Sequence, residues 1–280
     1  MKNIHKLNQK CLRQTLLASL LVILTGTVSA HDIYIWPSFF SSSIEDNGYI
    51  PVDITASHTT FRPDFAMGSD GLEVYGADGK QLWNTGSFFE GMRRSTFDLP
   101  IAGPGTYALK YRSGPIYSTS YVIGRSDEPK FVRGNKEEVA DQIPSKAKKV
   151  KTTAYLSLGM AYVTNNAPSD AVLQPSGNGF ELVPVTHPAD YVTGEEIVIS
   201  LQRDGEPVTE QDVVIELEGP NYREQPIVFE LQSDAEGLVS FTPEHGGRYM
   251  TKVLAERQVE SALTDVELTR VYYAFEVIYE

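Results

Sequence analysis

Short runs of alternating apolar and polar residues, rich in β-branched and aromatic side chains, follow one another along most of the chain. Examples are "GRYMTKVLAER" (247–257) and "TRVYYAFEVIYE" (269–280). In "LEVYGADGKQLW" (72–83) an Asp78-Gly79 pair lies where a hairpin would turn. A period of two predicts strands, and turn signals at regular spacing are typical of β-sandwiches. The sequence therefore predicts an all-β fold.

The strand-like runs form two blocks. About six predicted strands fill residues 31–125, and a second set fills 180–280, so we predict two immunoglobulin-like β-sandwich domains. The segment 126–179 between them is polar at its start and predicts a linker. Within it, Asn135 is placed to cap a short helix over 136–142, and 152–164 predicts a long strand that belongs to either domain.

The first thirty residues have the pattern of a secretory signal peptide. The basic residues of this segment are Lys2, Lys6, Lys10 and Arg13. A short apolar run, Leu16 to Leu24, and the small-residue motif Val28-Ser29-Ala30 follow. This run is too short to span a bilayer, and Cys11 precedes it, which argues against a lipoprotein anchor. We predict cleavage after Ala30, export to the periplasm and His31 as the first residue of the processed chain, the alternative being an uncleaved anchor.

The composition excludes several classes of protein. Cys11 is the only cysteine, so the processed chain has no disulfide and its fold depends on packing. The net charge of −13 becomes more negative once the basic leader is removed, and such a surface repels nucleic acid and anionic lipid. After the leader, no apolar stretch is long enough for a membrane span. We therefore expect neither nucleic acid as a partner nor a membrane span.

No motif of a common enzyme class is present. The processed chain lacks a cysteine nucleophile, and the sequence has no G-x-S-x-G elbow, H-E-x-x-H pair or phosphate-binding glycine loop. A pair of glycosidase carboxylates has no sequence spacing that could be tested. We predict that the protein is not an enzyme.

The histidines are the most informative residues for predicting function, because they are candidate metal ligands. After the leader, histidine occurs at His31, His58, His187 and His245, and no two of these have the spacing of a local metal pair. His187, flanked by Pro184 and Pro188, is predicted to make a structural hydrogen bond, and His245 falls in a predicted turn. A metal site would have to be assembled by the fold.

His31 has special chemistry if it begins the processed chain. Its α-amine and its ring Nδ1 can chelate one ion, and both can be neutral donors near neutral pH. If strand 32–36 pairs with strand 49–57, His58 approaches His31, and Asp32 and Asp64 can add oxygen ligands. Nitrogen donors suit nickel, cobalt, copper and zinc. The alternative is that His31 is frayed in solvent and His58 is a turn residue.

One segment resembles a known family. In "GNGFELVPVTHPADYVTGEEIVISLQRDGEPV" (177–208), the matching residues are Gly179, Glu181, Leu182, Pro184, Thr186, His187, Pro188, Gly194, Glu195, Asp204, Gly205 and Pro207. Together with "AHDIYIWPS" (30–38), "VDITASHTTFRPDFAMG" (52–68) and "RRSTFDLPIAGPGTY" (93–107), they are similar to the exported DUF4198 proteins. The resemblance implies a periplasmic component grouped with nickel and cobalt uptake, and a mature His-Asp or His-Glu start, which His31-Asp32 matches.

These observations predict a periplasmic accessory protein that binds a transition-metal ion. Nickel or cobalt is favoured, with copper and zinc as alternatives, and the predicted ligands are His31, His58, Asp32 and Asp64. The predicted partner is a membrane metal transporter or an outer-membrane receptor. Two other functions stay open: a metal-free interaction module of the cell envelope, and a carbohydrate-binding module.

Overall fold

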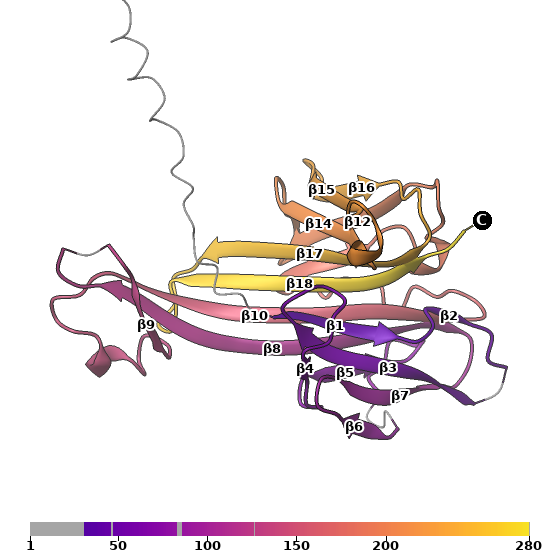
Figure 1. The fold of residues 1–280 in the computed structure, drawn as a ribbon, viewed down its shortest axis with the longest axis horizontal. Helices are drawn as coiled ribbons and strands as arrows, with labels where there is room; N and C mark the ends of the chain where they lie inside the picture. The colour runs from indigo at the N-terminus through magenta and orange to yellow at the C-terminus, as the bar shows by residue number, and fades with distance from the viewer. Residues whose placement is uncertain (1–30, 46, 83–85, 126, 280) are drawn as a thin grey trace, which may run out of the picture. The chain divides into compact units, whose positions relative to one another are not determined.

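The computed structural model of the protein describes residues 31–45, 47–82, 86–125 and 127–279, and the predicted signal peptide lies outside them. The described chain consists of strands, loops and three short 3-10 helices (Figure 1). These helices are η1 (Ala140–Gln142), η2 (Pro188–Asp190) and η3 (Pro220–Tyr222). The predicted all-β class is confirmed. Within the described part, no helix has the length and apolar character needed to cross a membrane.

The described strands form three sheets. The N-terminal sheet contains β1 (Asp32–Pro37), β3 (Gly48–Ser57), β4 (Phe65–Ala66), β6 (Phe88–Glu90) and β7 (Ser95–Ile101). The central sheet contains β2 (Ser41–Ser42), β5 (Leu72–Tyr75), β8 (Gly105–Val122), β9 (Lys130–Arg133), β10 (Lys148–Asn165), β14 (Asp212–Leu217), β15 (Val228–Gln232), β17 (Gly247–Gln258) and β18 (Val266–Val277). The C-terminal sheet contains β11 (Phe180–Pro184), β12 (Ile197–Arg203), β13 (Glu206–Pro207) and β16 (Leu238–Phe241).

The central sheet joins the two halves of the chain. Its strand β10 lies between β8, to which it is antiparallel, and β18, to which it is parallel; Met160 pairs with Lys110 on one side and Tyr273 on the other. The predicted long strand at 152–164 is thus an inner strand of a sheet that both halves share. Residues 31–280 form one compact unit. The predicted domain boundaries, 31–125, 126–179 and 180–280, stay predictions.

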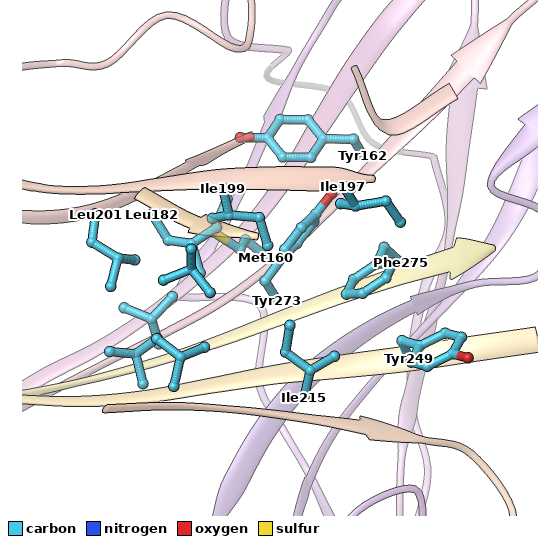
Figure 2. Packing of buried hydrophobic residues seen from close by; sticks show 14 of the residues in the cluster. Met160, Tyr162, Leu182, Ile197, Ile199, Leu201, Ile215, Tyr249, Tyr273 and Phe275 are labelled. Atoms are coloured by element: carbon cyan, nitrogen blue, oxygen red, sulfur yellow. The ribbon is translucent and has the colours of Figure 1, made fainter. Parts of the chain in front are cut away.

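Each face of the central sheet covers a separate hydrophobic core. We call the cluster between the N-terminal and central sheets the first core; it includes Ile35, Ile54, Leu99, Leu109, Ala161 and Tyr272. The second core lies between the central and C-terminal sheets and includes Met160, Leu182, Ile199, Ile215, Tyr273 and Phe275 (Figure 2).

Successive side chains of β18 point to opposite faces of the central sheet and therefore pack in different cores. Tyr272 and Ala274 pack in the first core, whereas Tyr273 and Phe275 pack in the second. Full burial of a large apolar side chain contributes about 1.5–3 kcal/mol. One strand therefore stabilises both sandwiches at once.

Strand β8, Gly105–Val122, is one of the two longest described strands, although a glycine and a proline interrupt its sequence. Gly114 and Pro115 lie inside it, with Gly114 at a φ of 101°, a conformation that glycine adopts freely. Strand β10 has an irregularity opposite this point, between Tyr155 and Ser157, so pairing resumes beyond it. A local irregularity in the pairing thus accommodates the glycine and proline, and β8 continues on both sides of them.

The helix predicted over 136–142 is shorter than expected. The side-chain oxygen of Asn135 accepts hydrogen bonds from the backbone N–H groups of Glu137 and Glu138, both at 3.0 Å, but these residues belong to a run of turns. Helical geometry is limited to η1, whose N-cap residue is Val139 and has no side-chain cap hydrogen bond, so Asn135 caps the turns and not the helix. Pro144 lies two residues beyond, where a helix cannot continue.

Strand β1 lies close against the central sheet at Gly159. A Cβ atom at this position would lie 3.1 Å from the backbone oxygen of Ile33, closer than most side chains tolerate. The Asp32 carboxylate also forms an ion pair of 3.0 Å with Lys252 on β17. The start of β1 is thus held both by close packing and by charge, and it positions the site described next.

Candidate functional site

Antiparallel pairing of β1 with β3 brings His31 and His58 together. Asp32 pairs with Ser57, so His31 directly precedes the paired segment on one strand and His58 directly follows it on the other. The two imidazole rings are 4.0 Å apart between centroids, at an interplanar angle of 64°. The predicted strand pairing and the approach of the two histidines are confirmed, whereas their role as metal ligands stays a prediction.

Phe65 contacts both rings. It begins β4, which pairs with β3 through Ala56, and its ring centroid lies 4.6 Å from that of His31 and 5.6 Å from that of His58. The Nε2 atom of His31 is buried and has no hydrogen-bond partner among the described residues. A buried nitrogen without a partner costs about 1–3 kcal/mol. The fold therefore leaves one imidazole nitrogen without a protein partner.

Asp64 lies behind His58. Its Oδ2 atom accepts a hydrogen bond from the His58 backbone N–H at 3.0 Å and is 3.4 Å from His58 Nδ1, while Arg93 lies 3.7 Å from Oδ1. The hydrogen bond from the His58 backbone is the main cause that lowers the pKa of Asp64, so its side chain is a carboxylate at neutral pH. A carboxylate beside Nδ1 favours the proton there and leaves Nε2 as a lone-pair donor.

Asp32 belongs to a different cluster. Its carboxylate accepts a hydrogen bond from Thr60 at 3.3 Å and pairs with Lys252, whose ammonium group is also 3.3 Å from Glu216. Neighbouring side chains on a strand point to opposite faces, so Asp32 lies on the face opposite His31. The four predicted ligand residues are therefore not equivalent: two imidazoles meet, Asp64 supports one of them, and Asp32 is engaged elsewhere.

A metal ion needs more than the two imidazoles. Within the described ranges, no group of three or more histidine, cysteine, aspartate or glutamate side chains is arranged to hold a metal ion. The backbone nitrogen of His31 is a further candidate donor, since it becomes an amine if the chain is cleaved after Ala30. The number of donors at the site would then depend on that cleavage.

The remaining histidines have other surroundings. His187 Nδ1 accepts a hydrogen bond from the Ala189 backbone N–H at 3.0 Å and caps η2, and its Nε2 lies 3.0 Å from Thr106 Oγ1. The predicted structural hydrogen bond of His187 is confirmed. His245 contributes its backbone oxygen, which accepts a hydrogen bond of 2.7 Å from the Tyr249 hydroxyl.

Sequence reasoning did not single out Phe65, Arg93 or Lys252. Each contacts the site or its neighbouring cluster through pairing of distant segments. The one local signal is the position of Phe65 directly after Asp64, in the loop that returns from His58.

No curated protein matches the sequence of this chain, and the solved structures that resemble it do so at low identity and low TM-score. The D0-D1 domain of intimin has 10% identity and a TM-score of 0.21, covering 88% of this chain and 98% of that one. The chicken CNTN1 FN1-FN3 domains have 10% identity and a TM-score of 0.20, covering 88% and 99%. The Escherichia coli adhesin FdeC has 11% identity and a TM-score of 0.20, covering 89% and 99%. TM-scores this low carry no conclusion about function.

A family model matches most of the sequence. Residues 28–257 match the family described as "Domain of unknown function (DUF4198)". The match contains His31, His58 and the complete segment 177–208, and it extends over most of the chain. The chain therefore belongs to the DUF4198 family.

Proposed function

We propose that the processed protein binds a transition-metal ion through His31 and His58 and serves as an exported accessory of metal uptake. The observation that carries this proposal is the 4.0 Å separation of the two ring centroids at the start of β1. A further observation supports it: Oδ2 of the Asp64 carboxylate lies 3.4 Å from Nδ1 of His58, which leaves Nε2 of His58 as the donor atom.

The proposed ligands are three nitrogen atoms. After cleavage, the amine and Nδ1 of His31 chelate the ion, and Nε2 of His58 is the third donor. Imidazole nitrogen atoms bind ions such as zinc at about 2.0–2.1 Å, so the rings have to rotate slightly to receive the ion. His58 can rotate because its side chain is 54% exposed, and no protein hydrogen bond on Nε2 holds the ring of His31.

Nickel and cobalt are the ions that we propose, with delivery to a membrane metal transporter in the periplasm. Both accept imidazole and amine ligands. Copper binds such donors more tightly than the other divalent ions in the first transition row, so a comparison of ions must include it, together with zinc. The acidic composition of the chain favours approach of any cation.

Calorimetric titration of the chain that begins at His31 tests the proposal. We expect one ion of nickel or cobalt to bind per chain. A matched chain with one alanine added before His31 has no amine in the chelate, and His58→Gln removes the third donor. Each change should weaken binding by about tenfold or more, since a lost ligand costs more than 1.4 kcal/mol.

His245→Gln is the control and should leave affinity unchanged, because His245 is exposed and contributes only its backbone oxygen to the hydrogen bond with Tyr249. Equal affinity of the native and alanine-extended chains would show that the chelate is wrong. Absence of binding for all four ions would overturn the metal function and leave the metal-free envelope module or the carbohydrate-binding module.

A further inference from the structure

A pocket of about 200 Å³ lies beside the face of the N-terminal sheet that carries Tyr34 and Thr55. These two residues pair across β1 and β3, and loop residues 61 and 63 form another part of the wall. Residues 218 and 248, at the paired ends of β14 and β17, complete it. Neither His31 nor His58 lines this pocket, so it is separate from the proposed metal site.

One wall of the pocket is aromatic. The rings of Trp36 and Phe61 are in edge-to-face contact, with centroids 5.4 Å apart, and Tyr34 adds a third ring. The Arg248 guanidinium lies over Trp36, 5.3 Å from the ring centroid. Such a wall favours an apolar group next to a cation that the protein itself provides.

The other wall carries two acidic and two basic side chains. One acidic and one basic residue form an ion pair with each other, and the other two form none within the described residues. Arg94 and Asp53 neutralise each other through an ion pair of 2.8 Å, and Thr96 donates a further hydrogen bond to Asp53. Glu218 and Arg248 are neighbours through a backbone hydrogen bond of 2.7 Å, from the Glu218 N–H to the Arg248 oxygen. In the described chain neither side chain forms an ion pair.

Arg248 retains most of its hydrogen-bonding capacity. Its guanidinium has five N–H donors, and the described structure uses one of them, on the Ser38 oxygen at 3.3 Å. The Glu218 carboxylate has capacity for several donors. A ligand with a carboxylate and an ammonium group would pair with both residues through charge-assisted hydrogen bonds, which are stronger than neutral ones.

The geometry points to a binding site for a free α-amino acid with an apolar side chain. The ligand carboxylate pairs with Arg248, its ammonium group pairs with Glu218, and its side chain packs on Trp36 and Phe61. The pocket volume agrees with this class, because sites for larger, drug-sized ligands measure about 300–1,000 Å³. This site is independent of the proposed metal function.

Calorimetry with L-leucine, leucinamide and N-acetyl-leucine tests the assignment. Leucinamide lacks the carboxylate and N-acetyl-leucine lacks the ammonium group, so each should bind the native chain about tenfold or more weakly than leucine. Arg248→Gln should weaken the binding of leucine by a similar factor, and leucine and leucinamide should then bind with equal affinity. Glu218→Gln should also weaken the binding of leucine, and leucine and N-acetyl-leucine should then bind with equal affinity.

Arg133→Gln and Glu230→Gln are matched controls on exposed parts of β9 and β15, and leucine should bind both as it binds the native chain. The assignment is overturned if leucine gives no heat at concentrations on the order of 10 mM. It is equally overturned if the three ligands bind the native chain alike. The comparison of ligands on the native chain does not depend on how the variants fold.

Discussion

The carboxylate of Asp64 holds His58 at two points: its Oδ2 atom is 3.0 Å from the backbone nitrogen of His58 and 3.4 Å from Nδ1 of its ring. The backbone contact fixes the turn that follows β3, and the ring contact favours a proton on Nδ1. One carboxylate thus contacts both the backbone and the ring of the proposed ligand.

The first prediction concerns this carboxylate. Asp64→Asn removes the charge behind His58, and metal affinity should fall by about 10–100-fold, as is usual when the partner of a ligating histidine is lost. Titration of the processed chain with nickel measures the change. Asp78→Asn is the control, because Asp78 is exposed and pairs with Lys80 in the turn that follows β5. Unchanged affinity for Asp64→Asn would exclude a supporting role for Asp64.

The second prediction is a pH dependence of stability from the same residue. The pKa of Asp64 is lower in the folded chain than its ordinary value of 3.8, mainly because the His58 backbone N–H donates to it. The ionised carboxylate therefore stabilises the fold above about pH 4, and this contribution is lost as the pH falls through the lowered pKa.

The melting temperatures of the native chain and of Asp64→Asn should accordingly differ by a constant amount at neutral pH. The difference should shrink below about pH 4, because the native carboxyl then becomes uncharged like the amide. A thermal-melt series in metal-free buffer measures it. A difference that stays constant down to about pH 2 would contradict the assignment of the shift to Asp64.

The third prediction concerns the ion cluster at the start of β1. The Lys252 side chain is 27% exposed, and it pairs with Asp32 and Glu216, which are 19% and 17% exposed. Lys252→Met leaves two poorly hydrated carboxylates without a cation and should lower the free energy of unfolding by about 2 kcal/mol or more. Urea unfolding measures the change.

Lys80→Met is the matched control, because the ion pair of Lys80 with Asp78 is exposed to solvent and should contribute little to stability. If Lys252→Met and Lys80→Met lower the free energy of unfolding equally, the cluster around Lys252 stabilises the fold no more than an exposed ion pair does.

The fourth prediction follows from the central sheet that the two cores share. Ile215, in the second core, is fully buried, and Ile215→Ala should cost about 2–5 kcal/mol. Both tryptophans of the chain, at positions 36 and 83, belong to the first 125 residues. Tryptophan fluorescence during urea unfolding should nevertheless report the full decrease in the free energy of unfolding that Ile215→Ala causes. The reason is that disruption of β14 and β18 also affects the first core.

Ile54→Ala, in the first core, should shift the same single transition. Two independent domains would behave differently: the fluorescence transition of Ile215→Ala would stay at the native midpoint. That result would support the predicted division at 31–125 and 180–280.

The fifth prediction concerns His187. His187→Ala removes the cap of η2 and the contact with Thr106, and should cost about 1–2 kcal/mol. Asparagine also caps helices, so His187→Asn should retain part of the stability. His245→Ala is the control and should change stability by less than about 0.5 kcal/mol, because the structure uses the backbone of His245. Equal losses at both positions would contradict the capping role.

Local patterns predicted much of this structure. The alternation at 247–257 and 269–280 corresponds to β17 and β18, and the turn at Asp78-Gly79 is present, with a hydrogen bond from the Gly76 N–H to the Lys80 oxygen. The approach of His31 to His58 was also predictable, because it requires only that two early strands pair without a shift of register.

Other features depend on contacts that local patterns do not encode. The parallel pairing of β10 with β18 joins residues about a hundred positions apart, and no turn signal specifies it. Asp32 was expected near the metal, but Lys252 on β17 pairs with it once β1 packs on the central sheet. The pocket beside Trp36 likewise forms only when Arg248 reaches the N-terminal sheet.

The first core contains residues from both ends of the described chain. Its first members belong to β1, and its last members, Tyr272 and Ala274, belong to β18, the last strand. Synthesis delivers the chain from its N-terminus. The sheet that contains β1 and β3 is therefore complete before residues 266–277 are made, and until then the part of its core that Tyr272 and Ala274 fill is uncovered. A chaperone that protects β1 and β3 during that interval would have to release them only after the last strand has been made.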